Sequence, residues 1–255
     1  MDPWLLTGLA LTVVVGLSLG FLGAGGSAIT VPVFIYVLGM PAREAIAMSL
    51  LVVGSTSLVG ATLNARRGVV AWKIGSIFAV FGVVGAYLGS FLTYLVPPAV
   101  LLLLYATLIL ITGALMLARR EGDAARLAPH RVPFLPTVAS GFAAGLLTGF
   151  LGVGGGFLIV PLLVWFGGLD MRDAIGTSLM VIAFNSGAGL AGHLGRAAID
   201  SHFALYLTLC AVTGAAAGAA LAHQASRTTL RRAFALLLIG IATFLLIRNS
   251  EAIRI

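Results

Sequence analysis

The sequence predicts an all-α integral membrane protein made of two repeats. Of its 255 residues, 60% are hydrophobic and 9% are charged, which is more apolar surface than one soluble core could bury. No charged residue occurs from Pro3 to Ala42 or from Ile74 to Ala118. The segment GFLGAGGSAITVP at residues 20–32 returns as GFLGVGGGFLIVP at residues 149–161. The chain is therefore expected to cross a bilayer several times as a duplicated unit.

The two copies stay in register without a gap, at an offset of 129 residues. Matched pairs along the chain are Arg43 with Arg172, Ser49 with Ser178, Gly60 with Gly189, Arg67 with Arg196, and Gly89 with Gly218. An internal repeat of apolar segments is typical of secondary transporters, in which the substrate site lies where the two halves meet.

Each half is expected to contain five apolar elements. The first half has them at 4–22, 27–38, 42–63, 69–95 and 98–117, and those of the second half begin at Pro133, Gly156, Met171, Asp200 and Arg227. A helix of about 12 residues rises only about 18 Å, whereas the hydrocarbon core of a bilayer is about 30 Å thick. Residues 27–38 and 156–167 are therefore predicted to be half-helices or re-entrant arms.

The domain organisation and orientation follow from the polar residues. We expect a first transmembrane repeat at 1–118, a cytoplasmic linker at 119–132 and a second transmembrane repeat at 133–255. If the first two elements of each half enter the membrane and return, the second half is inverted. The cytoplasmic loops then hold eleven basic residues against four outside, while a parallel repeat gives ten and five. The positive-inside rule favours inversion by this small margin.

The net charge of +7 is interpreted as this loop bias and not as a nucleic-acid surface. The N-terminus lacks the basic region and cleavage site of a secretory signal, so the first helix is expected to stay. The single Cys210 is expected to be a packing residue, and no metal site or cofactor is predicted.

The glycine-rich segments are the first candidate substrate site. Each ends one helix and opens a short one, whose free N–H groups carry partial positive charge and favour an anion. The residues proposed to bind substrate there are Gly23, Gly25, Gly26 and Ser27 in the first copy, and Gly152, Gly154, Gly155 and Gly156 in the second. The alternative is that such glycines only let helices pack closely, as Gly16-x3-Gly20 and Gly85-x3-Gly89 are expected to do.

The third element of each half is expected to supply polar side chains to the same site. Spacings of three and four residues place them on one helix face. The proposed donors are Ser49 and Thr56 in the first half, and Ser178 and Asn185 in the second. Hydrogen bonds to neighbouring helices or to their own backbone are the alternative. Asn64 and His193 lie near loops and are candidates for coupling or gating, with an interfacial structural role as the alternative.

Two further features are expected to be architectural. Pro32 and Pro161 should bend or break the half-helices. Arg43 with Glu44, and Arg172 with Asp173, are expected to form local ion pairs or helix caps at the start of element three.

The paired GFLGxGG…VP motifs, the duplicated halves and the chain length resemble the sulfite exporter and 4-toluene sulfonate uptake permease family, the TauE/SafE type. The resemblance covers nearly the whole chain. It implies a multi-pass protein of the bacterial inner membrane that transports sulfite, sulfoacetate or another organosulfonate. The residues that it reaches are Gly20, Gly23, Gly25, Gly26 and Pro32, and Gly149, Gly152, Gly154, Gly155, Gly156 and Pro161.

Other functions remain open from the residues alone. An anion channel could use glycine-lined arms as a filter, and a transporter could carry another small anion such as a carboxylate. An intramembrane hydrolase is disfavoured, because Ser178 and His193 lie about 22 Å apart along one helix. We therefore expect no enzyme, a small anionic substrate, a lipid environment and a coupling ion that is a proton or sodium; the oligomeric state stays open.

Overall fold

The computed structural model describes residues 3–118, 134–152, 156–197, 200–222 and 226–249. All regular structure in these residues is helical. The elements are α1 (Pro3–Leu22), η1 (Gly23–Gly26), α2 (Ser27–Tyr36), α3 (Ala42–Arg66), α4 (Trp72–Leu92), α5 (Pro98–Ala118), α7 (Phe134–Leu151), α8 (Gly156–Trp165), α9 (Met171–His193), α10 (Ser201–Ala222) and α11 (Arg227–Asn249). The predicted all-α class is confirmed.

Seven of the helices in the described residues are long and apolar enough to cross a membrane, namely α3, α4, α5, α7, α9, α10 and α11. The helices α2 and α8 have 10 residues each, and such a helix rises only about 15 Å. They begin at the two glycine-rich segments, as the sequence predicts, and are too short to span the bilayer on their own. This chain is therefore a multi-pass membrane protein.

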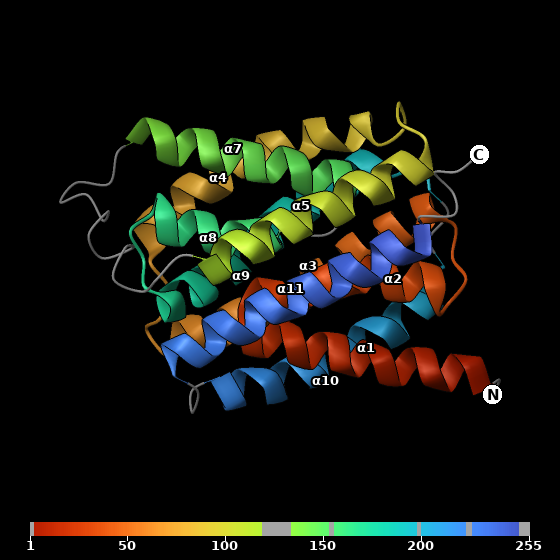
Figure 1. The fold of residues 1–255 in the computed structure, drawn as a ribbon, viewed down its shortest axis with the longest axis horizontal. Helices are drawn as coiled ribbons and strands as arrows, with labels where there is room; N and C mark the ends of the chain where they lie inside the picture. Colours follow the sequence, from red (N-terminus) through yellow and green to blue (C-terminus); the bar gives the residue numbers. More distant parts are fainter. Residues whose placement is uncertain (1–2, 119–133, 153–155, 198–199, 223–225, 250–255) are drawn as a thin grey trace.

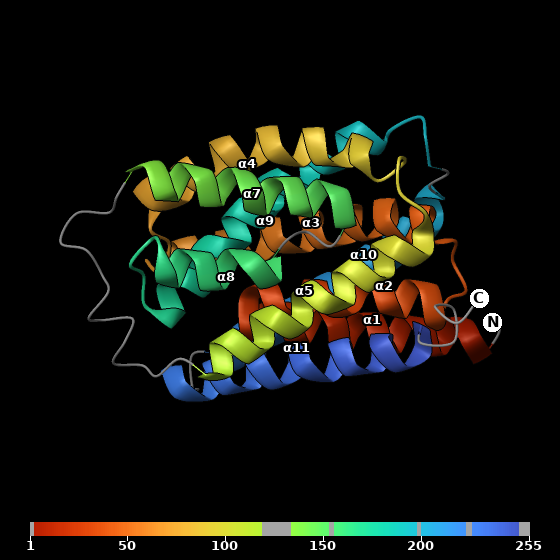
Figure 2. The ribbon, with the colours of Figure 1, turned by 45° about the horizontal axis from the view of Figure 1, so that its top comes forward.

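The counterpart helices of the two halves run in opposite directions (Figures 1 and 2). From the side where the chain begins, α1 runs across the molecule, α2 returns, and α3 crosses again. The helices α7, α8 and α9 follow the same course from the other side. We call the side on which α1 begins and α11 ends the termini side, and the side on which α5 ends and α7 begins the linker side. This course is the one that an inverted repeat requires.

The two halves are interleaved, because the first helix of each packs along the fourth helix of the other. The pairs are α1 with α10 and α7 with α4. A Cβ added at Gly16 would lie 2.0 Å from Ala211 O, and one added at Gly145 would lie 2.0 Å from Gly82 O. These distances leave no room for a side chain, so the predicted packing role of the GxxxG repeats is confirmed.

The centre of the molecule is the antiparallel pair α3 and α9. In an apolar stretch of 18 residues, 61% of the residues in α3 and 67% in α9 are buried, against 33–44% in the same length of the other five candidate spans. Helices that face lipid keep an exposed apolar side, and α3 and α9 expose less of their surface than the other candidate spans. The buried polar groups of these two helices, among them Ser49, Thr56, Ser178 and Asn185, are therefore shielded from both lipid and water.

The half-helices continue through their prolines, so of the predicted bend or break, the break is wrong. Pro32 lies inside α2 and Pro161 inside α8. A proline in a helix leaves the carbonyl four residues earlier without its usual partner. In α2 that carbonyl belongs to Ala28, and the Tyr105 hydroxyl from α5 donates to it at 2.6 Å. A side chain from the fifth helix thus replaces the missing backbone bond.

Candidate functional site

The first glycine turn, Gly23–Gly26, forms the short 3₁₀ helix η1 between α1 and α2. Gly23 has φ +67°, a left-handed conformation that glycine adopts without strain. A Cβ added to it would lie 2.9 Å from Ile175 Cγ2 and 3.2 Å from Ser178 Oγ. The turn of the first half is therefore held against α9 of the second half.

The second glycine turn repeats this arrangement on the other central helix. Gly152 has φ +68°, and a Cβ added there would lie 2.0 Å from Ile46 Cγ2 and 2.9 Å from Ile46 Cα. The Ser49 hydroxyl lies within hydrogen-bond reach of the carbonyl of Gly152. Gly156, the buried first residue of α8, follows this turn. Each glycine turn therefore meets the third helix of the opposite half.

The other predicted residues of the glycine-rich segments lie in different surroundings. Gly154 and Gly155 lie outside the described residues. Gly25 lies within η1. Gly26 packs against α1, since a Cβ added there would lie 2.3 Å from Leu19 N. Ser27, at the start of α2, is fully buried.

Three of the four predicted side-chain donors direct their hydroxyls to backbone carbonyls. Thr56 donates to Val52 O at 2.6 Å and Ser178 to Ile175 O at 2.8 Å. Ser49 has two carbonyls in reach, Ile46 O at 2.8 Å and Gly152 O. A hydroxyl carries one proton, so an anion would have to draw it away from these carbonyls. Of the three, only Ser49 reaches a glycine turn, and all three are secondary candidates for substrate contact.

Asn185 is different, because its amide is fully buried and has no hydrogen-bond partner among the described residues. It faces Gly82 of α4: a Cβ added there would lie 2.5 Å from Asn185 Oδ1. Leaving a buried amide unpaired costs about 1 to 3 kcal/mol. An anion that accepts from Nδ2 would recover part of this free energy. Asn185 is therefore the strongest of the predicted donors.

Two serines that the sequence analysis missed lie on the same central helices. Ser57 of α3 and Ser186 of α9 are fully buried and their hydroxyls have no partner among the described residues. Ser186 faces α3, because a Cβ added at Gly54 would lie 3.0 Å from Ser186 Cβ. Ser57 and Ser186 occupy matching positions of the repeat. That match was the available signal.

Asn64 and His193 occupy matching positions at opposite ends of the central pair. Asn64 Nδ2 donates to Gly60 O at 2.9 Å, and His193 Nδ1 lies 3.0 Å from Gly189 O. Both side chains are therefore anchored to the carbonyl one turn earlier in their own helix. The structure does not bring them into one site.

On the termini side, His193 joins a group of aromatic and cationic side chains that we call the Tyr94 cluster: Arg43, Tyr94, His193 and Arg196. The rings of Tyr94 and His193 lie 5.5 Å apart. The guanidiniums of Arg43 and Arg196 lie 5.5 and 5.3 Å from the Tyr94 ring centre. The interaction predicted between Arg43 and Glu44 does not appear among the described contacts, where Arg43 stacks on Tyr94.

The Tyr94 cluster borders the second glycine turn. Thr93, next to Tyr94 in the chain, donates to Phe150 O at 2.7 Å. The carbonyl of Gly189 contacts His193 Nδ1, and a Cβ added at Gly189 would lie 3.5 Å from Gly149 Cα. The sequence analysis missed Tyr94, which lies at the end of the predicted element 69–95 and in the structure follows α4.

The matching region on the linker side borders the first glycine turn and holds a small cavity. A cavity of about 20 Å³ there is lined by Gly20, Asn64, Val69, Arg172, Ile175, Ala219, Ala222 and Leu230. That volume is about enough for one water molecule. The α9 start is capped by Asp170, whose carboxylate accepts from the backbone N–H groups of Arg172 and Asp173 at 3.0 and 3.1 Å. Arg67 donates to Ala219 O of α10 at 3.0 Å.

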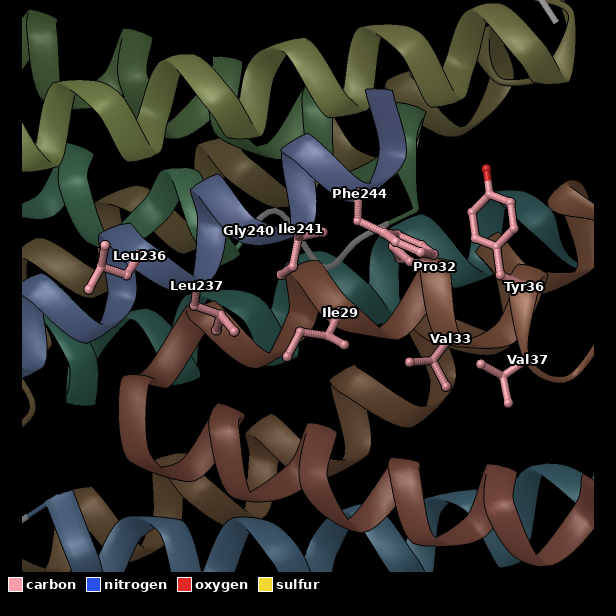
Figure 3. A pocket seen from close by; sticks show the side chains of 10 residues that line it. All are labelled: Ile29, Pro32, Val33, Tyr36, Val37, Leu236, Leu237, Gly240, Ile241 and Phe244. Atoms are coloured by element: carbon pink, nitrogen blue, oxygen red, sulfur yellow. The ribbon is translucent and has the colours of Figure 1, made fainter. Parts of the chain in front are cut away.

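A larger pocket, of about 440 Å³, lies between α2 and α11 and is apolar (Figure 3). It is lined by Ile29, Pro32, Val33, Tyr36, Val37, Leu236, Leu237, Gly240, Ile241 and Phe244. Tyr36 supplies the one polar side chain of this lining, and its ring meets Phe244 edge-on at 5.7 Å. A pocket without several donors does not suit an anion. Among the described residues no group of three His, Cys, Asp or Glu could hold a metal ion.

The fold and these contacts define a multi-pass membrane protein with an internal repeat and buried polar groups at its centre. Residues 8–245 match the family model described as "Sulfite exporter TauE/SafE". The chain therefore belongs to the TauE/SafE sulfite exporter family, a family of membrane transporters.

Curated relatives agree with this assignment. A "Probable membrane transporter protein" of Xylella fastidiosa (strain 9a5c) is 33% identical over 241 residues, which cover 92% of each chain. The "Probable membrane transporter protein YdhB" of Bacillus subtilis (strain 168) is 29% identical over 226 residues, covering 86% of this chain and 90% of YdhB. No solved structure matches this chain.

Proposed function

We propose that this protein is a secondary transporter that moves a small sulfur-containing anion, such as sulfite, sulfoacetate or another organosulfonate, across the bacterial inner membrane by alternating access. Membership of the sulfite exporter family supports the substrate class. The excess of basic residues in the connections on the linker side supports a cytoplasmic location for that side.

One observation carries the proposal: each glycine turn contacts the third helix of the opposite half. Gly23 meets Ile175 and Ser178, and Gly152 meets Ile46 and Ser49. A movement of one half against the other must therefore act on both turns at once. Transporters with inverted repeats use such a movement to expose a central site alternately to the two sides.

The anion would bind between the glycine turns and the centre of α3 and α9. The starts of α2 and α8 contribute partial positive charge through their first N–H groups. Asn185, Ser57 and Ser186 add buried donors that have no other partner among the described residues. These groups would bind the anion through hydrogen bonds and helix dipoles, without a lysine or arginine.

Uptake by proteoliposomes tests this proposal. The purified full chain should transport radiolabelled sulfite or sulfoacetate with saturation kinetics and with dependence on a proton or sodium gradient. Flux that rises linearly with concentration and ignores both gradients would instead establish an anion channel. Preference for a small carboxylate over every sulfur anion would show that the substrate class is wrong.

Thermal stabilisation of the detergent-solubilised protein gives an independent measure of substrate choice. A ligand that binds only the folded state raises its stability, by about 2.7 kcal/mol at a hundredfold excess over Kd. The order of stabilisation among sulfite, thiosulfate, taurine, sulfoacetate and acetate should match the order of transport. A sulfur anion that is transported but does not stabilise the protein contradicts a saturable site.

A further inference from the structure

The Tyr94 cluster contains two buried polar atoms that nothing in the described structure satisfies. Both Tyr94 Oη and His193 Nε2 lack a hydrogen-bond partner. Their rings are 5.5 Å apart at the termini end of α9. Buried polar atoms in proteins rarely lack a hydrogen-bond partner. Tyr94 Oη and His193 Nε2 therefore point to a ligand that binds between or beside them.

The charged residues around these two atoms indicate the charge of that ligand. Arg43 and Arg196 are exposed and lie over the Tyr94 ring, and Arg196 also lies 4.5 Å from the centre of the Phe91 ring. Among the described contacts, aromatic rings are the partners of both guanidiniums. Two cations without a carboxylate partner raise the local concentration of anions and leave donors available to bind one.

The hydrogen bond of His193 fixes what its free nitrogen can do. Gly189 O can only accept, so Nδ1 carries the proton in the 3.0 Å contact between them. In a neutral imidazole Nε2 then presents a lone pair, which repels an anion. Only the doubly protonated ring can donate from Nε2. The Tyr94 phenol is protonated at neutral pH in any case, since burial raises its pKa more than Arg196 and Arg43 lower it.

We propose that the Tyr94 cluster is a second anion site on the termini side, where Tyr94 Oη and protonated His193 Nε2 donate to a small oxyanion and the ring takes up one proton with each anion bound. This inference rests on the proposed transport function and adds the entry site and the coupling ion. The anion attracted by Arg43 and Arg196 brings a proton from solution to Nε2. When the anion leaves, that proton is released.

The groups that face His193 make its protonation depend on a bound anion, because burial and the cationic Arg196 both oppose the imidazolium. Tyr94 comes from the connection after α4, Arg43 from the start of α3, and Arg196 from the segment after α9 itself. No carboxylate among the described residues contributes to the surroundings of His193. The imidazolium therefore has no fixed negative partner and depends on a bound anion to balance its charge.

The repeat itself supplies the test variant. Asn64 occupies the matching position and makes the same contact to the carbonyl one turn earlier, at 2.9 Å. His193→Asn should therefore keep the anchoring hydrogen bond while removing the titrating nitrogen. His202→Asn is the matched control, because His202 is exposed at the start of α10 on the same side.

The experiment is equilibrium binding to the purified full chain by calorimetry, with sulfate and methanesulfonate as probes. Their charges are constant between about pH 5 and 8, where histidine titrates. Wild type and H202N should bind more weakly by about tenfold for each pH unit above the pKa of His193. H193N should bind weakly with no such slope. Tyr94→Phe should lose about tenfold or more at every pH and keep the slope.

The outcomes separate this inference from the proposed function. Retention of the full pH slope in H193N, or unchanged affinity in Y94F, overturns the second site even if transport is established. Failure of wild type to bind or transport any sulfur anion overturns the proposed function, and the inference with it. Calorimetry in buffers of different ionisation enthalpy counts the protons taken up on binding. We expect one proton per anion in wild type and none in H193N.

Discussion

The two ends of the α3 and α9 pair carry the same positions of the repeat but use them differently. On the linker side Arg67 donates to Ala219 O, one of the last carbonyls of α10. Its counterpart Arg196, on the termini side, lies over the rings of Phe91 and Tyr94. An arginine that completes a helix end is structural, whereas an exposed arginine stacked on half-buried rings keeps its N–H groups for a ligand.

Asn64 on the linker side and His193 on the termini side also differ in this way. Asn64 and His193 make equivalent contacts to their own helices, but only His193 carries a titratable ring. The two ends thus share this contact but differ in the side chain that makes it. If the protein works by alternating access, as proposed, this difference would let the two ends respond to different conditions.

The comparison of the two ends requires them to face opposite sides of the membrane. A test of this topology has the largest expected effect. A green fluorescent protein fused after Ile255 should stay dark, while alkaline phosphatase fused there should be active, because α11 ends on the termini side. A reporter inserted in the 119–132 linker should give the reverse pattern. The same reporter result at both places contradicts the inverted repeat.

The two glycine turns should differ in tolerance. Gly152→Ala places its Cβ 2.0 Å from Ile46 Cγ2 and 2.9 Å from Ile46 Cα, whereas Gly23→Ala meets Ile175 Cγ2 at 2.9 Å. We expect G152A to abolish folded protein and G23A to reduce it. Gly195→Ala is the control, since its φ is also positive, at +75°, but a Cβ there meets nothing within 4 Å. Fluorescence-detected size-exclusion chromatography measures the yield; equal yields of all three variants contradict the packing argument.

The central polar positions of the two halves should also behave differently. Asn185→Leu removes an amide that has no partner, so it should weaken anion binding by about ten- to a hundredfold while leaving thermal stability unchanged or raised. Thr56→Val, at the matching position, removes a hydroxyl that already donates to Val52 O and should change affinity by less than about threefold. Equal effects of the two changes would remove Asn185 from the site.

The smallest expected effects separate Arg67 from Arg196. Arg67→Gln should lower stability by about 1 kcal/mol through the lost bond to Ala219 O, with affinity for the anion unchanged. Arg196→Gln should leave the melting temperature unchanged and weaken anion binding severalfold, more at low than at high ionic strength. Melting curves and binding measured on the same preparations decide the matter. A loss of stability in R196Q with unchanged affinity would reverse the assigned roles.

Much of the candidate site could be predicted because the duplication marks it twice. The glycine-rich segments end where α2 and α8 begin, and Ser49, Ser178, Thr56 and Asn185 do lie on the buried central pair. What the sequence did not indicate is which donors are already used. Ser178 donates to Ile175 O and Asn185 to nothing in the described structure, although spacing alone makes them equivalent.

The sequence by itself determined the membrane environment, the order of the helices in the described residues and the two short elements, because apolar length and glycine clusters are local properties. The helix ends differ from the prediction by a few residues, since α4 runs from Trp72 to Leu92 within the predicted 69–95. Only the tertiary structure decided that the halves interleave, that each glycine turn meets the opposite half, and that Tyr94, His193, Arg43 and Arg196 form one cluster. These are contacts between residues far apart in the chain. They depend on how helices cross in three dimensions, which no periodicity within one helix encodes.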